Sequence, residues 1–110
     1  MNLSDIKKVK IVVTVPSTHS DIVRKVMGDA GAGLVGNYSH CSFSTLGTGR
    51  FLPHLGAHPH IGEIGTTEEV EEDRVEANVS IEKIEEVIRA IKAVHPYEEV
   101  VYDVYSLLDY

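Results

Sequence analysis

The order in which two kinds of apolar spacing follow one another along the chain constrains the fold more than any other feature. Residues 8–15 place apolar β-branched side chains at every second position, and apolar and polar side chains alternate again over residues 70–79. This period is typical of a strand with one buried face. Residues 17–30 and 81–94 instead repeat apolar side chains every three or four positions, which is typical of an amphipathic helix. Each half of the chain is therefore predicted to contain a strand that is followed by a helix.

The middle of the chain is predicted to supply a second strand and an insertion. Residues 34–46 are predicted to form a mostly polar strand, Gly47-Thr48-Gly49 a turn, and residues 50–52 a short returning strand. Residues 53–66 are rich in glycine, proline and histidine, yet too apolar for a flexible linker. We therefore expect an extra β-hairpin at about residues 47–64, between the two halves of the fold.

A last strand completes the order. It is predicted at residues 100–105, after His95 and Pro96 end the second helix. Strand–helix–strand twice in succession predicts an α+β, ferredoxin-like βαββαβ fold, in which two helices cover one face of a four-stranded antiparallel sheet. A chain of 110 residues has room for one such domain, over residues 1–110. The other sheet face needs a cover, and a small domain commonly obtains one by oligomerisation.

Charge and hydropathy indicate the setting in which the protein works. Residues 66–110 contain four basic against thirteen acidic residues, within a net charge of −7 for the whole chain. This balance lacks the basic footprint that nucleic-acid binding requires. No apolar run approaches the roughly 18 residues of a membrane span, residues 1–5 have no signal-peptide character, and the single cysteine, Cys41, fits a reducing compartment. We therefore expect a cytoplasmic protein that binds neither nucleic acid nor membrane.

Three histidines within seven positions form the strongest candidate for a metal site. They are His54, His58 and His60. Histidine is the commonest metal ligand, and Cys41, His40 and Glu63 are candidate companions for a divalent metal ion. In the alternative interpretation Pro59 fixes the loop and the histidines face solvent. Their spacing matches no established zinc pattern, so both interpretations stay open at this point.

Two further segments have a structural and a functional interpretation. Cys41 could be a nucleophile, but His40 is its sequence neighbour and would point to the opposite face of a strand, so a small packed side chain is favoured. The segment His95–Glu99 follows the second helix. It is interpreted either as a helix stop with Tyr97 packed on the core, or as a loop that lines a cleft between subunits. The spacing alone does not separate these two.

A series of short motifs resembles a known family. The motifs include Gly36-Asn37-Tyr38, Cys41-Ser42-Phe43, Gly47-Thr48-Gly49-Arg50-Phe51, His95-Pro96-Tyr97-Glu98 and Tyr102-Asp103-Val104. This series is similar to the PII-like, CutA-like insertion domain of bacterial Nif-three-like proteins, a family named for a dinuclear metal centre. It looks closest to the short, stand-alone form of that domain. The resemblance runs from about residue 8 to the last residue.

The resemblance implies a ferredoxin-like fold, a homotrimer, and a hairpin insertion as a family feature. It places the ligands of the dinuclear metal centre in two flanking halves that this sequence does not contain. The motifs that define the family do not include His54, His58 or His60. The candidate ligand surface is the cleft between subunits. PII proteins bind nucleotides between subunits, but this sequence offers no basic cluster for phosphates beyond Arg50, so a metal ion is favoured over a nucleotide. The residues that we expect to line this cleft are Tyr38, Cys41, Arg50, His95, Tyr97 and Glu98.

The sequence is compatible with three functions. The first is a non-catalytic trimeric module that binds a small molecule or a metal ion and has a regulatory role. The second is a metal-dependent, hydrolase-type enzyme, with the three histidines as ligands and Glu63 as the base. The third is an interaction subunit that docks on a partner protein. The sequence favours the first, because it offers no nucleophile with a base beside it.

Overall fold

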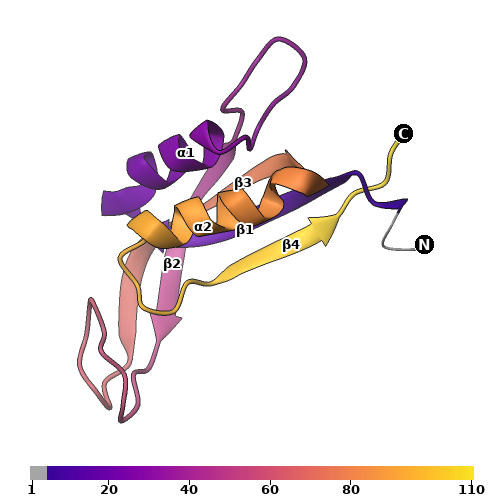
Figure 1. The fold of residues 1–110 in the computed structure, drawn as a ribbon. Coiled ribbons are helices and arrows are strands. Elements are labelled where there is room, and N and C mark those ends of the chain that lie inside the picture. Colours follow the sequence, from indigo (N-terminus) through magenta and orange to yellow (C-terminus); the bar gives the residue numbers. More distant parts are fainter. Residues whose placement is uncertain (1–4) are drawn as a thin grey trace.

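The computed structural model describes residues 5–110 and shows a four-stranded antiparallel sheet with two helices on one face (Figure 1). The strands are β1 (Lys8–Pro16), β2 (Phe43–Phe51), β3 (Glu68–Ser80) and β4 (Tyr102–Ser106), and the helices are α1 (Ser20–Asp29) and α2 (Ile84–Val94). Short 3-10 turns, η2 (Ser17–His19) and η3 (Ile81–Lys83), lead into the helices. The spatial order β2-β3-β1-β4 is that of a ferredoxin-like βαββαβ domain, so the predicted fold class is confirmed.

The core lies between the sheet and the helices. Every second residue of β1 points into it, as the alternation predicted, and α1 and α2 each add one apolar stripe. The fully buried apolar residues include Ile11, Val13, Val15, Val23, Met27, Val75, Val87 and Ile91. Within residues 5–110, none of the helices has the length and hydropathy needed to cross a bilayer.

The segment between α1 and β2 differs from the prediction. Residues 34–42 form a loop rather than most of a strand, and β2 begins only at Phe43. Inside the loop, Val35 and Tyr38 exchange two backbone hydrogen bonds of 2.9 Å across a tight turn. The turn places Gly36 at a φ of +55°, a conformation that glycine adopts readily and that interrupts an extended chain.

The predicted turn at Gly47-Thr48-Gly49 is wrong, because these residues lie in the middle of β2 and pair with β3. Strand β2 pairs with β3 as far as Phe51 and Glu68, whereas β1 pairs with β3 only as far as Glu72. The two strands therefore project beyond the sheet as a hairpin, and residues 52–67 connect its ends (Figure 1). The extra hairpin is thus a continuation of β2 and β3, with its turn later in the sequence than we predicted.

Candidate functional site

A cavity of about 540 Å³ lies at the base of the projecting hairpin, on the sheet face turned away from the helices. Thr14, Thr45 and Arg74 line it, and in each strand these positions alternate with residues of the core face. The loop of residues 52–67 and the segment that follows α2 supply the remaining walls. Three separate parts of the chain therefore meet at one cavity, as expected of a ligand site.

The most buried charged side chain of this cavity is Glu72, only 8% of which is exposed. The Tyr97 hydroxyl donates a hydrogen bond of 2.8 Å to its Oε2. Burial, together with the hydrogen bond to Glu72 and its negative charge, raises the pKa of Tyr97 far above its usual value, so that Tyr97 stays a donor at any ordinary pH. On the other side of the carboxylate lies Gly49, where a β-carbon would collide with the Glu72 oxygens.

His95 fixes the segment that carries Tyr97. Its ring is 7% exposed, and Nε2 lies 2.8 Å from the carbonyl oxygen of Thr14, so Nε2 carries the proton and donates. Nδ1 accepts a hydrogen bond of 3.1 Å from the backbone N–H of Tyr97 and is therefore unprotonated. Burial lowers the pKa of His95, which agrees with a neutral ring. His95 thus ends the helix and at the same time aims Tyr97 at Glu72.

Aromatic rings cover one wall of the cavity. The ring centroids of Phe51 and Tyr97 are 5.7 Å apart in an edge-to-face arrangement, and those of His60 and Tyr97 are 6.5 Å apart. Glu98 accepts a hydrogen bond of 2.7 Å from the backbone N–H of His58, which ties the loop of residues 52–67 to the segment after α2. The cavity wall is therefore held by contacts between distant parts of the chain.

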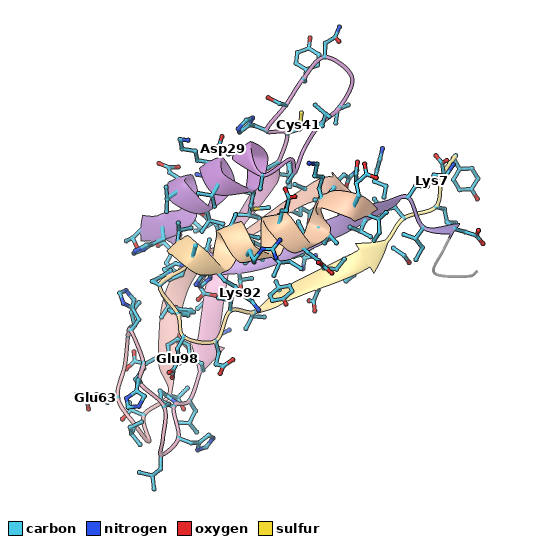
Figure 2. The ribbon with its side chains drawn as sticks, viewed as in Figure 1. Lys7, Asp29, Cys41, Glu63, Lys92 and Glu98 are labelled. Carbon is cyan, nitrogen blue, oxygen red and sulfur yellow. The ribbon has the colours of Figure 1, made fainter. Side chains whose placement is uncertain are left out.

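The structure divides the predicted ligand residues into two groups. Arg50, Tyr97 and Glu98 line the cavity, and His95 lies directly behind Tyr97. Tyr38, 74% exposed, and Cys41, also exposed, lie in the loop of residues 34–42. Figure 2 shows Cys41 at the opposite end of the molecule from Glu98. The single chain therefore does not bring Tyr38 and Cys41 to the cavity.

The residues that sequence reasoning missed are Glu72, Gly49 and Thr14. Glu72 looked like one of several acidic residues on a solvated strand, and Gly49 like part of a turn. Only the pairing of β2 with β3 brings Glu72 and Gly49 together. The register of this pairing could not be predicted once a turn was expected at residues 47–49.

His54, His58 and His60 are all exposed, and the His60 ring centroid lies 6.5 Å from that of Tyr97 and 5.8 Å from that of His19. Across residues 5–110 there is no group of three or more His, Cys, Asp or Glu side chains placed to hold a metal ion. A divalent metal bound by His54, His58 and His60 therefore stays a prediction, and it would require ligands to move together.

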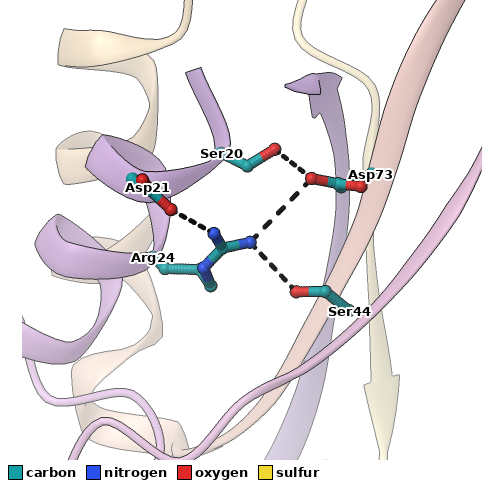
Figure 3. Close-up of polar contacts among 5 residues, drawn as sticks. All are labelled: Ser20, Asp21, Arg24, Ser44 and Asp73. Carbon is teal, nitrogen blue, oxygen red and sulfur yellow. Dashed lines mark hydrogen bonds and ion pairs between the residues drawn. The ribbon is translucent and has the colours of Figure 1, made fainter. Parts of the chain in front are cut away.

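Two other polar clusters attach α1 to neighbouring parts of the chain, and neither of them lines the cavity. Arg24 of α1 contacts Asp21, donates a 3.2 Å hydrogen bond to Ser44 of β2, and lies 4.0 Å from Asp73 of β3, which also accepts a hydrogen bond from Ser20 (Figure 3). The second cluster lies at the other end of α1.

There, His40 joins Ser39 at 2.8 Å and Asp29 at 2.9 Å. Although Ser, His and Asp follow one another in this chain of contacts, all three side chains are exposed at the surface. The hydrogen bond from Lys25, then that from His40, lowers the pKa of Asp29. The cluster attaches the loop of residues 34–42 to the end of α1.

No protein-family model matches this sequence. The chain is 50% identical over 99 residues to a "GTP cyclohydrolase 1 type 2 homolog" of Mycobacterium tuberculosis, and 49% identical over 100 residues to the protein of the same name in Bacillus subtilis. These alignments cover 90% and 89% of this chain but 26% of each relative.

Solved structures agree with this similarity. A Bacillus cereus protein related to NIF3 superposes with a TM-score of 0.82 at 49% identity, over 94% of this chain and 26% of that one. The chain is similar to one segment of NIF3-related proteins. It spans about a quarter of their length, which agrees with the resemblance seen in the sequence, while its occurrence as a stand-alone domain stays a prediction.

Two more distant structures share the fold alone. CutA from Archaeoglobus fulgidus superposes with a TM-score of 0.66 at 19% identity, over 91% of this chain and 83% of that protein. The Bacillus subtilis GlnK–ATP complex superposes with a TM-score of 0.63 at 13% identity, over 92% and 82%. Both confirm the CutA-like and PII-like architecture that the sequence motifs implied.

We expect Gly49→Ala to displace the Glu72 carboxylate and to lower the free energy of unfolding by about 1 kcal/mol. The displaced carboxylate loses the Tyr97 hydrogen bond, and the lower chain entropy of alanine offsets only part of that loss. Gly47→Ala is the matched control, because a β-carbon at Gly47 meets no atom within 4 Å. Urea unfolding of both variants measures the difference, and equal stabilities would contradict the close contact between Gly49 and Glu72.

Proposed function

We propose that this chain is a non-catalytic module that binds a small ligand and works as a homotrimer with a regulatory role. The observation that carries the proposal is the cavity of about 540 Å³ with a buried carboxylate, Glu72, held in place by Tyr97. Its volume lies in the range of small-molecule sites. The loop of residues 52–67 and the segment after α2 both contribute walls, so a bound ligand would contact both and couple them.

The chemistry of the cavity favours binding over catalysis. Its described lining contains neither serine nor cysteine, and Cys41 lies on the distant loop. The name of the NIF3-related relatives refers to proteins about four times as long, so an activity of the whole protein need not reside in this segment. None of the threonine hydroxyls of the described lining is hydrogen-bonded to a histidine or a carboxylate. The Tyr97 hydroxyl is bonded to Glu72, but it keeps its proton because its pKa is raised, so the described cavity wall presents no activated nucleophile for covalent hydrolysis.

Binding can be tested by thermal shift with a panel that contains organic cations, organic anions, neutral aromatic compounds, ATP, Zn²⁺ and Co²⁺. At least one compound should raise the melting temperature in a concentration-dependent way, because a ligand that binds only the folded state stabilises it. A panel without any such compound would count against ligand binding. A shift with Zn²⁺ that disappears in a His58→Ala, His60→Ala double variant would instead support the predicted metal site.

A trimer is supported by apolar side chains that the single chain leaves exposed. Phe43 on β2 is 66% exposed and shares a sheet face with Thr45, a cavity residue, and Tyr105 on β4 is 46% exposed. A second copy placed on this face would bury such residues and complete the cavity wall.

We therefore expect light scattering to give three times the chain mass of 12.1 kDa. Phe43→Asp should weaken the assembly by placing a charge in the buried contact. Leu55→Asp is the control, because Leu55 is 93% exposed on the loop of residues 52–67 and, unlike Phe43, is not part of a strand. A mass of one chain for the unmodified protein would contradict the trimer.

A further inference from the structure

We propose that the cavity binds an organic cation, whose N–H groups donate hydrogen bonds to Glu72 and whose flat apolar body lies against Phe51 and Tyr97. This inference rests on the proposed ligand-binding function and adds the chemical class of the ligand. The best match is an amidinium or guanidinium group on an aromatic or apolar body. Each part of such a ligand corresponds to one feature of the cavity.

The first feature is a carboxylate with unused acceptor capacity. Glu72 is more than nine-tenths buried and lines the cavity. Its Oε2 accepts one hydrogen bond from Tyr97, and within residues 5–110 neither a donor to Oε1 nor a cationic partner is present. A buried carboxylate is stabilised chiefly by a cation that also donates hydrogen bonds. A ligand cation in the cavity would supply the positive charge and the hydrogen-bond donors that the described residues do not offer to Glu72.

The second feature is the charge of the surrounding wall. The other acidic residues of the wall are Glu98 and Glu99. The two arginines there are already engaged, since Arg50 pairs with Glu69 at 3.1 Å and Arg74 with Glu76 at 3.4 Å. An anionic ligand such as a phosphate would therefore meet three carboxylates and no free cation among the described lining residues. The same wall attracts a cation.

The third feature is the aromatic wall. The rings of Phe51 and Tyr97 meet at 64°, and His60 lies beyond Tyr97. Aromatic faces attract cations and pack well against flat apolar groups. A delocalised, planar amidinium is weakly hydrated and can present two N–H donors to one carboxylate, so it gains more in this setting than a strongly hydrated metal ion or ammonium group.

Benzamidine is a suitable probe, because benzamide and benzoate have nearly the same shape but are neutral and negatively charged. Isothermal titration of the full chain should show benzamidine binding at least about tenfold more tightly than benzamide, with no binding of benzoate. Glu72→Gln preserves the shape of the side chain and should raise the Kd for benzamidine at least about tenfold. Glu71→Gln is the matched control, because Glu71 is exposed and points to the opposite sheet face. It should leave the Kd unchanged.

A second measurement keeps the proposal testable if Glu72→Gln does not fold. Benzamidine added to the ¹⁵N-labelled unmodified protein should shift the amide resonances of Gly49 and Tyr97, which flank the Glu72 carboxylate. Shifts confined to other residues, or equal binding of the three probes, would overturn the cation while leaving ligand binding intact. If no probe binds and no compound of the wider panel does, the proposed function falls as well.

Discussion

Replacing Gly33 with alanine should lower the free energy of unfolding by about 2–5 kcal/mol. Gly33 has a φ of +80°, where an L-residue costs roughly 1–2 kcal/mol. In addition, a β-carbon there would collide with the backbone nitrogen and carbonyl oxygen of Cys41. Backbone atoms cannot rotate aside as a side chain does, and overpacking of this kind typically costs about 1–3 kcal/mol. Urea unfolding followed by circular dichroism measures the loss.

Gly36→Ala separates the two causes. Gly36 has a φ of +55°, but a β-carbon there meets no atom within 4 Å. This variant should therefore lose only the conformational part, about 1–2 kcal/mol. Equal losses in the two variants would show that the contact between Gly33 and Cys41 is not as close as described.

The Gly33 contact also explains why part of the fold could not be predicted from the sequence. The Gly33 N–H donates to the carbonyl of Asn78 at 2.7 Å, and its own carbonyl accepts from the Cys41 N–H at 3.0 Å. After α1 the chain therefore reaches the edge of β3 at Gly33, makes a loop, and returns to Gly33 at Cys41, shortly before β2 begins. These are long-range backbone contacts, and the alternation of residue types over residues 34–46 carries no trace of them.

Strand β1 and helices α1 and α2 could be predicted because each has one buried face, and the spacing of apolar residues records that face directly. Strand β2 is different, because its burial pattern is exposed at nearly every position. Its continuity through Gly47 and Gly49 depends on pairing with the long strand β3. Glycine is depleted in strands, so local preference predicted a turn and the pairing overrode it.

The candidate site, too, was predicted from the sequence only in part. Arg50, Tyr97 and Glu98 were predicted from motifs that resemble a family, and the structure brings these three to one cavity. Glu72 escaped notice because its neighbours in the sequence are also acidic. Its burial results from Tyr97 on one side and Gly49 on the other, 25 and 23 positions away in the chain.

Acid should destabilise the protein through His95. The ring is neutral in the folded state, and burial lowers its pKa below the ordinary 6.5. The hydrogen bond to the Thr14 carbonyl and the charge of nearby Glu72 oppose this shift, and the charge of His19 adds to it. In the unfolded chain the same histidine takes up a proton as the pH falls through about 6.5. The unfolded state then binds more protons than the folded state. Stability is therefore full above pH 6.5 and decreases below it, by up to about 1.4 kcal/mol per pH unit until the folded-state pKa is reached.

A comparison of variants assigns this loss to one residue. In His95→Gln the amide can still donate to the Thr14 carbonyl, but the side chain no longer titrates. Urea unfolding between pH 7.5 and pH 5.0 should therefore show a much smaller decrease in stability for His95→Gln than for the unmodified protein, while His54→Gln, at an exposed position, should retain the full decrease. Parallel curves for all three proteins would mean that the acid sensitivity arises elsewhere.

A flattened curve for His95→Gln alone would show that the segment which aims Tyr97 at Glu72 is held by a neutral imidazole. Because His95 accepts the Tyr97 N–H through Nδ1, protonation would remove that acceptor and weaken the attachment of the cavity wall.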